Sequence, residues 1–201
     1  METGPAGADP SGTGRPADEE YAAGAERYHA VPIEPGVLDR LRTRDDAGRA
    51  LAPFTDGEGG APLRCCLRAS RAGESLALVS YAPLRRWAAR SGATPGAYDE
   101  QGPVFIHAAP CGGPDPADTR FPFVRPGALR VLRRYGADGR IAGGLLLEIP
   151  EDPAPAFDAA LAEAFADPAV AFVHVRAVEY GCFLFLVGRP PTGAPPGAGQ
   201  G

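Results

Sequence analysis

The chain contains no lysine, because all 20 of its basic residues are arginine, and its 25 acidic residues give it a net charge of −5. We attribute the missing lysine to the base composition of the gene, since arginine, alanine, glycine and proline share GC-rich codons. A negatively charged chain without a broad basic stripe is poorly suited to neutralising the phosphates of a nucleic acid. We therefore expect no nucleic-acid partner.

Long apolar segments are also missing. No stretch approaches the roughly 20 apolar residues that span a bilayer, and the first residues have neither the basic nor the apolar region of a secretory signal. We therefore predict a soluble, cytoplasmic protein without a membrane partner. In a reducing cytosol cysteines remain thiols rather than disulfides, and we expect this of Cys65, Cys66, Cys111 and Cys182.

Two kinds of phosphate-binding motif are absent. No G-x-G-x-x-G follows a strand pattern and there is no Walker loop, so the chain lacks the glycine-rich loops that cradle nucleotide phosphates. The C-x-x-C spacing typical of structural zinc sites is missing as well. The motifs thus predict no cofactor, and zinc is kept as an alternative that depends on how the fold brings histidine and cysteine together.

One segment has enough apolar residues for a core, and it lies between two ends of low complexity. Residues 1–27 and 190–201 consist largely of glycine, proline, alanine and polar residues, which cannot bury enough surface to offset the entropy of ordering. We predict that both ends are disordered tails. Residues 28–189 are predicted to form a single domain, because the chain is 44% hydrophobic and shows no internal repeat.

Short apolar or alternating runs separated by turn residues predict antiparallel hairpins. The clearest turn signal is Asp138-Gly139, which separates two such runs at 129–135 and 141–149. The other expected strands are a hairpin of 64–68 with 75–81, a hairpin of 172–177 with 182–187, a single strand at 103–108 and a short edge strand at 28–33.

Apolar residues recur at helical spacing in three places. The strongest case begins after Asp152, a residue favoured at helix N-caps, because large apolar residues recur at intervals of four from Phe157 to Phe165. Shorter helices are expected over 37–41 and 84–90. Hairpins with two or three interspersed helices, and no repeating strand–helix–strand order, predict a single α+β domain with a mainly antiparallel sheet.

The C-terminal hairpin sorts its side chains by chemistry. A three-residue loop at 179–181 would pair Arg176 with Leu184. Strand alternation then predicts one polar face, formed by His174, Arg176 and Cys182. The opposite, core-facing side is expected to hold Val173, Val175, Ala177, Phe183, Phe185 and Val187.

A set of short motifs runs through the same segment. They are Leu63–Leu67, Gly73-Glu74, Gly102–Ala108, Asp138–Arg140, Asp167-Pro168, His174–Arg176 and Glu179–Cys182. In these motifs and their order, residues 28–189 resemble the DUF1203 family, whose name denotes a domain of unknown function. The resemblance implies an uncharacterised bacterial domain, and it assigns no activity, substrate or catalytic residue.

The residues themselves favour a binding site near the C-terminal hairpin. Guanidinium groups bind carboxylates and phosphates in a forked geometry, and strands that carry histidine and arginine on one face can direct them into one pocket. We predict a polar pocket for a small anionic ligand, formed by His107, Arg176, Arg64 and Glu179.

Three alternatives stay open. A cysteine-dependent enzyme would use Cys182 as nucleophile and His174 as its base, although a free cysteine is more often a small buried apolar residue. A protein-interaction module would use the surface around Trp87. A zinc-containing protein or enzyme would use a tetrahedral set of His107, Cys111, His174 and Cys182. The sequence does not show whether the protein is an enzyme, nor what its oligomeric state is.

Overall fold

The computed structural model describes residues 28–190. The predicted tail at 1–27 and nearly all of the tail at 190–201 lie outside the described residues, so the domain boundaries stay a prediction. None of the helices within 28–190 combines the length and the apolar character that crossing a bilayer requires. These helices are α2 (Pro35–Thr43), α3 (Pro83–Ser91), α4 (Pro153–Ala166) and a short 3-10 helix, η1 (Gly96–Tyr98).

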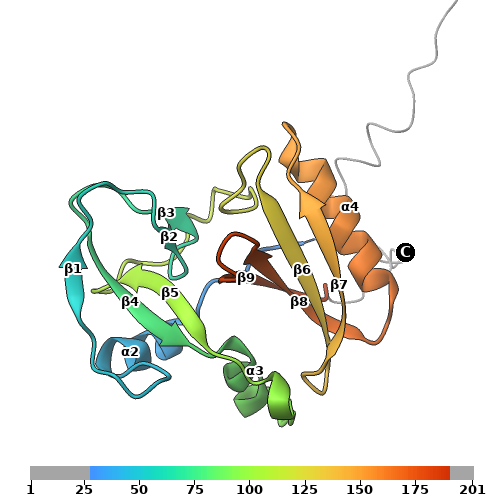
Figure 1. Cartoon of the computed structure of the whole chain (residues 1–201), viewed down its shortest axis with the longest axis horizontal. Coiled ribbons are helices and arrows are strands. Elements are labelled where there is room, and N and C mark those ends of the chain that lie inside the picture. The colour runs from blue at the N-terminus through green and yellow to red at the C-terminus, as the bar shows by residue number, and fades with distance from the viewer. Residues whose placement is uncertain (1–27, 191–201) are drawn as a thin grey trace, which may run out of the picture.

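The strands of the described chain form two sheets, which lie side by side in Figure 1. One sheet has the order β1-β4-β5-β2-β3 and the other has the order β7-β6-β8-β9. Their pairings are antiparallel except that of β2 with β5. The predicted α+β fold with mainly antiparallel sheet is therefore confirmed. The strands are β1 (Pro53–Thr55), β2 (Pro62–Leu63), β3 (Arg68–Ala69), β4 (Ser75–Tyr81), β5 (Gly102–His107), β6 (Leu129–Gly136), β7 (Ile141–Glu148), β8 (Val170–Ala177) and β9 (Phe183–Gly188).

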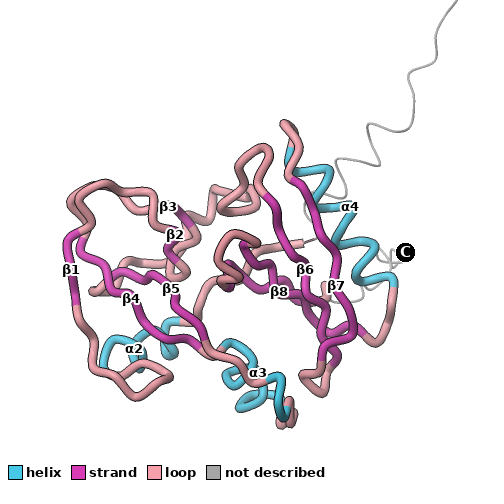
Figure 2. The backbone as a smooth tube through the Cα atoms, in the orientation of Figure 1, coloured by secondary structure: helices cyan, strands magenta, loops and turns pink. Residues whose placement is uncertain are grey.

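Helix α4 covers one face of the four-stranded sheet (Figure 2). It begins after Asp152, as the sequence predicts. Its residues Phe157 and Leu161 are fully buried. They pack in one apolar core with Val175 of β8 and Phe185 of β9, so this helix fixes the position of the C-terminal hairpin from behind.

Two predicted hairpins are confirmed. Strands β6 and β7 form the first, with Leu129 opposite Glu148. Strands β8 and β9 form the second, with His174 opposite Leu186 as predicted. The connecting loop of the second hairpin contains Gly181 in the left-handed conformation at φ 65°, which a residue without a side chain adopts at little cost.

The register of the C-terminal hairpin differs from the prediction near its loop. A bulge after Val175 pairs Arg176 with Phe183 rather than with Leu184. An extra residue in one strand reverses the side to which the following side chains point. Phe183 therefore contacts the His174 ring, at 5.0 Å between centroids, and its predicted place on the opposite face is wrong.

The predicted hairpin of 64–68 with 75–81 is wrong. Strand β4 pairs instead with β1 and β5, with Leu78 opposite Phe105. The segment 64–67 is a turn that joins β2 to β3, and it ends at Leu67 with φ 56°. The partner of β4 thus lies far along the chain, where the local pattern gives no indication of it.

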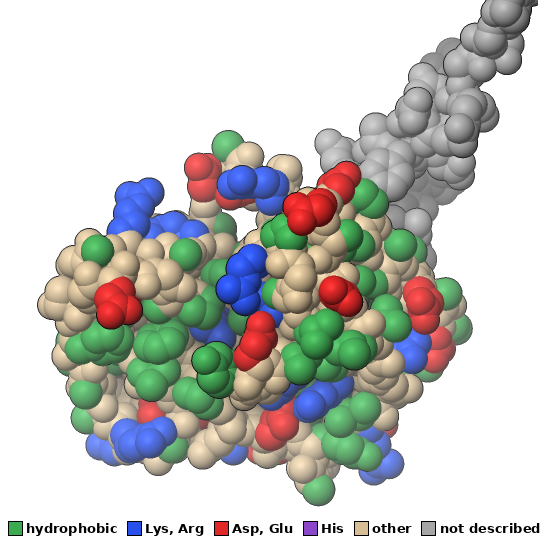
Figure 3. Space-filling view, turned by 45° about the horizontal axis from the view of Figure 1, so that its top comes forward, with side chains coloured by type: hydrophobic (Ala, Val, Ile, Leu, Met, Phe, Trp, Pro, Cys, Tyr) green, Lys and Arg blue, Asp and Glu red, His purple; other side chains and the backbone are tan. Residues whose placement is uncertain are grey.

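The remaining short elements follow the sequence closely. Helices α2 and α3 are confirmed, and Gly92 ends α3 in the left-handed conformation. The segment 28–33, predicted as an edge strand, forms a single bridge from Val31 to Leu186. The surface shown in Figure 3 intersperses basic, acidic and apolar side chains.

Candidate functional site

Three cysteines and one histidine gather where β5 ends beside the turn between β2 and β3. Cys65 and Cys66 lie in that turn, His107 is the last residue of β5, and Cys111 follows in the next loop. Their three sulfur atoms and one imidazole nitrogen lie within 4.8 Å of one another. Both turn cysteines and His107 are buried, and Cys111 is half-buried. We call these four residues the thiol cluster.

The three distances among Cys65, Cys66 and His107 match those of a tetrahedral metal site. His107 Nδ1 lies 3.4 Å from Cys65 Sγ and 3.8 Å from Cys66 Sγ. The sulfur atoms of Cys65 and Cys66 are 3.9 Å apart. Zinc–ligand bonds of about 2.3 Å to sulfur and 2.0 Å to nitrogen, at the tetrahedral angle, place sulfur about 3.8 Å from sulfur and about 3.5 Å from nitrogen.

The other ring nitrogen of His107 faces an ion pair. His107 Nε2 lies 3.4 Å from Glu74 Oε2 and 3.3 Å from Arg68 Nη2. Arg68 donates two hydrogen bonds to the Glu74 carboxylate, at 2.6 and 3.1 Å, and lowers the pKa of that group to about 2. The Glu74 carboxylate favours the tautomer with hydrogen on Nε2, which leaves the Nδ1 lone pair directed at the sulfur atoms, whereas the Arg68 guanidinium, which can only donate, favours the opposite tautomer.

Hydrogen bonds also stabilise thiolate in the cluster. The Cys65 thiol donates to the Cys66 sulfur, which lowers the pKa of Cys66 to about 6 and raises that of Cys65. Burial opposes the effect on Cys66, whereas the positive charge of Arg68 supports it. The backbone N–H of His107 donates to Cys65 Sγ at 3.3 Å. Thiolate is the form of cysteine that binds metals.

Half of the zinc set predicted from the sequence is found in the thiol cluster. His107 and Cys111 belong to it, but His174 and Cys182 do not. The missed ligands, Cys65 and Cys66, were expected in a strand, where neighbouring side chains point to opposite faces. Because the segment is a turn, both sulfur atoms point the same way. The vicinal cysteines, together with the H-x-x-x-C spacing after β5, were the signal in the sequence.

The polar residues of the C-terminal hairpin do not form the predicted catalytic pair. His174 is buried against the rings of Tyr135, Phe172 and Phe183. Neither of its ring nitrogens has a hydrogen-bond partner in the described part of the chain, so it makes no hydrogen bond to the Cys182 thiol. Cys182 Sγ instead lies 3.7 Å from the carbonyl oxygen of Tyr180.

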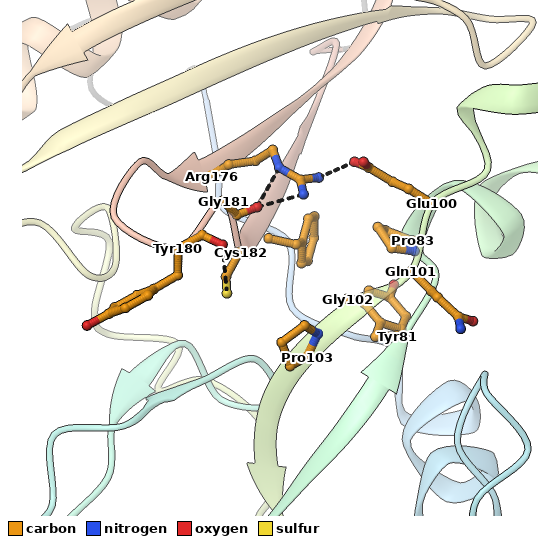
Figure 4. Close-up of a pocket in the computed structure, with 11 residues that line it drawn as sticks. Tyr81, Pro83, Glu100, Gln101, Gly102, Pro103, Arg176, Tyr180, Gly181 and Cys182 are labelled. Carbon is orange, nitrogen blue, oxygen red and sulfur yellow. Dashed lines mark hydrogen bonds and ion pairs between the residues drawn. The ribbon is translucent and has the colours of Figure 1, made fainter.

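Cys182 and Arg176 line a cleft that is open to solvent, between the C-terminal hairpin and the start of β5 (Figure 4). The Arg176 guanidinium donates to the carbonyl oxygen of Gly181 at 2.7 and 3.0 Å and to Glu100 Oε1 at 2.6 Å. The cleft is lined by Tyr81, Pro83, Glu100, Gln101, Gly102, Pro103, Arg176, Tyr180, Gly181, Cys182 and Phe183.

The four side chains predicted for the anion pocket lie in different places. Arg176 lines the cleft, and Arg64 lies behind it, where it donates to the carbonyl oxygen of Phe183. His107 belongs to the thiol cluster. Glu179 does not line the cleft and lies 3.5 Å from Arg130. A ligand-binding role for these four residues stays a prediction.

Comparisons with known proteins give one match. The family model described as "Protein of unknown function (DUF1203)" matches residues 60–189. This segment includes the whole thiol cluster and the residues that line the cleft. No curated protein and no solved structure matches the chain.

Proposed function

This chain belongs to the DUF1203 family, and we propose that its domain binds one zinc ion through Cys65, Cys66, His107 and Cys111. The observation that supports the proposal is the spacing of the cluster: the two sulfur–nitrogen distances of 3.4 and 3.8 Å and the sulfur–sulfur distance of 3.9 Å fit tetrahedral zinc.

The chemistry of the donors selects the metal. Three thiolates and one imidazole form a soft to borderline set, which suits zinc rather than magnesium or calcium, whose ligands are oxygen atoms. Four protein ligands complete a tetrahedral shell, and such closed sites are structural rather than hydrolytic. The expected role is therefore to join the β2–β3 turn, the end of β5 and the loop that contains Cys111.

Two neighbouring side chains support this assignment. Three thiolates around Zn²⁺ leave a net charge of −1, and Arg68 places a guanidinium next to the His107 ring. Glu74 lies beside Nε2 of the same ring, as carboxylates commonly do behind zinc-binding histidines. Arg68 thus compensates the negative charge of the metal-bound cluster, and Glu74 favours the tautomer that a bound metal requires.

The test is the zinc content of the purified chain. Wild-type protein reconstituted with Zn²⁺ and freed of excess metal should hold about one zinc per chain by elemental analysis. Cys65→Ser should lose most of it. Cys182→Ser is the matched control, because Cys182 lies outside the thiol cluster, and it should keep the wild-type content.

A further pair of variants separates loss of a ligand from loss of the fold. His107→Ala should release zinc, whereas His107→Cys supplies a fourth thiolate and should retain it. Wild-type protein that stays free of metal in excess Zn²⁺ would overturn the proposal. A Cys65→Ser variant with full zinc content would do the same.

The enzyme and interaction-module alternatives receive no such support. A cysteine nucleophile needs a base that is hydrogen-bonded to its thiol. His174 makes no such hydrogen bond, since both of its ring nitrogens lack hydrogen-bond partners in the described residues. Trp87 packs on Phe172, with 4.2 Å between ring centroids, which suits an anchor of α3. Binding of a small anion near the C-terminal hairpin is a separate proposal that depends on other side chains.

A further inference from the structure

The cleft beside the C-terminal hairpin has more positive than negative charge around it. Arg176 lines the cleft, Arg133 binds the same oxygen of the cleft residue Glu100 as Arg176 does, and Arg64 donates to the carbonyl oxygen of the cleft residue Phe183. Within residues 28–190 the carboxylate that pairs with any of the three is that of Glu100, which binds Arg133 and Arg176. Two positive charges are thus left without a carboxylate.

Arg64 is the more costly of these charges, because its side chain is buried and its described partners are neutral. Its Nε and Nη2 donate to the carbonyl oxygen of Phe183 at 2.9 and 2.7 Å, and Nη1 donates to the carbonyl oxygen of Pro62. Burial lowers the pKa of Arg64 to about 10. Buried charges are normally paired with an opposite charge, and Arg64 lies directly behind a residue that lines the cleft, Phe183.

Glu100 is held by two arginines but is not fixed by the fold. A single oxygen, Oε1, accepts from Arg133 at 2.7 Å and from Arg176 at 2.6 Å. The side chain is 42% exposed, and it lies in the irregular segment between η1 and β5. Figure 4 shows it reaching towards Arg176 from the opposite wall of the cleft. Its carboxylate can therefore swing into solvent without disturbing a helix or a strand.

We propose that this cleft binds a small molecule with two or more anionic oxygens, a phosphate or a dicarboxylate, and that Glu100 occupies the position of one of those oxygens until the ligand displaces it. Arg133 and Arg176 hold the ligand directly, and Arg64 adds a positive charge from behind. A singly charged ligand gains little, because it only replaces the charge of Glu100. A doubly charged ligand also compensates one of the two positive charges that Glu100 leaves without a carboxylate.

The test measures the binding of inorganic phosphate and of malonate by calorimetry, each against sodium chloride at matched ionic strength. Both probes should bind wild-type protein weakly, and Glu100→Gln should bind at least one of them about tenfold more tightly, because the competing carboxylate is gone. Whichever probe gains more identifies the ligand as a phosphate or a dicarboxylate. Arg176→Gln should lose the binding.

Matched controls come from an ion pair elsewhere on the surface. Asp118 is about as exposed as Glu100, at 45%, and pairs with Arg120. Asp118→Asn and Arg120→Gln therefore make the same changes in net charge and should leave binding unchanged. Where Arg176→Gln does not fold, Arg133→Gln tests the same contact.

Two outcomes would overturn the inference. One is that neither probe binds wild-type protein or Glu100→Gln more strongly than chloride does. The other is that Asp118→Asn strengthens binding as much as Glu100→Gln, which would make the effect one of net charge alone. Neither result bears on the zinc proposal, because the thiol cluster and the cleft share no residue.

Discussion

His174 is a titratable side chain that is buried without a hydrogen-bond partner in the described chain. Burial lowers its pKa to about 3, and the charges of Arg176 and Arg133 add to the effect. The rings of Tyr135, Phe172 and Phe183 contact the imidazole. Both arginines form ion pairs with the carboxylate of Glu100. The imidazole is therefore neutral in the native state at physiological pH.

This environment makes stability depend on pH in a defined direction. The pKa of His174 is lower in the folded chain than the 6.5 of an unperturbed histidine, so the unfolded chain binds the proton more readily. The contribution of His174 to the free energy of unfolding is therefore fully present above pH 6.5. It is lost as the pH falls towards 3, by up to about 1.4 kcal/mol per pH unit. Urea titrations at pH 7, 5 and 4 should show a steeper loss for wild type than for His174→Leu. Equal slopes for the two proteins would contradict the prediction.

How far single residues could be read from the sequence depended on the range of their contacts. Alternation along β8 correctly put His174 and Arg176 on one face. The burial of His174 could not be foreseen, because it depends on Phe183, which a bulge turns to the same face. The thiol cluster was missed in part because a turn, not a strand, contains Cys65 and Cys66.

Among the elements, α4 joins its sheet through a few large side chains. Phe157 is fully buried and stacks on Phe121, with 4.8 Å between ring centroids. Removing a buried phenylalanine ring costs about 3–5 kcal/mol through lost contacts and the remaining cavity. Phe157→Ala should lower the free energy of unfolding by about that amount in denaturant titrations. Glu163→Ala, an exposed change in the same helix, should stay within about 0.5 kcal/mol of wild type.

A loss below about 1 kcal/mol for Phe157→Ala would show that α4 is not a main support of the sheet.

Helix α4 and the hairpin of β6 and β7 were predictable because their signals are local: the helix has its apolar period, and the hairpin has its Asp138-Gly139 turn. Strand β4 was given the wrong partner because its pairing with β5 brings together residues far apart in sequence, such as Leu76 and His107.

For the whole molecule, the two sheets divide the stabilising contacts between them. The core under α4 belongs to the four-stranded sheet, whereas the thiol cluster lies at the end of β5 in the five-stranded sheet. The parallel pairing of β2 with β5, with Leu63 opposite Phe105, places the turn cysteines beside His107. No local pattern encodes that pairing, so the sequence showed the ligand types without showing which of them meet.

This division predicts where the loss of zinc is felt. Chelation removes the proposed link between the β2–β3 turn and the loop after β5, and it leaves buried thiolates that repel one another. Amide hydrogen exchange should therefore speed up by about tenfold or more at 62–69 and 105–111. Exchange in α4 and β8 should stay as in the zinc-bound protein, because their core contains none of the four ligands. Unchanged exchange at 62–69 in protein shown to have lost its zinc would mean that the metal does not hold this half of the fold together.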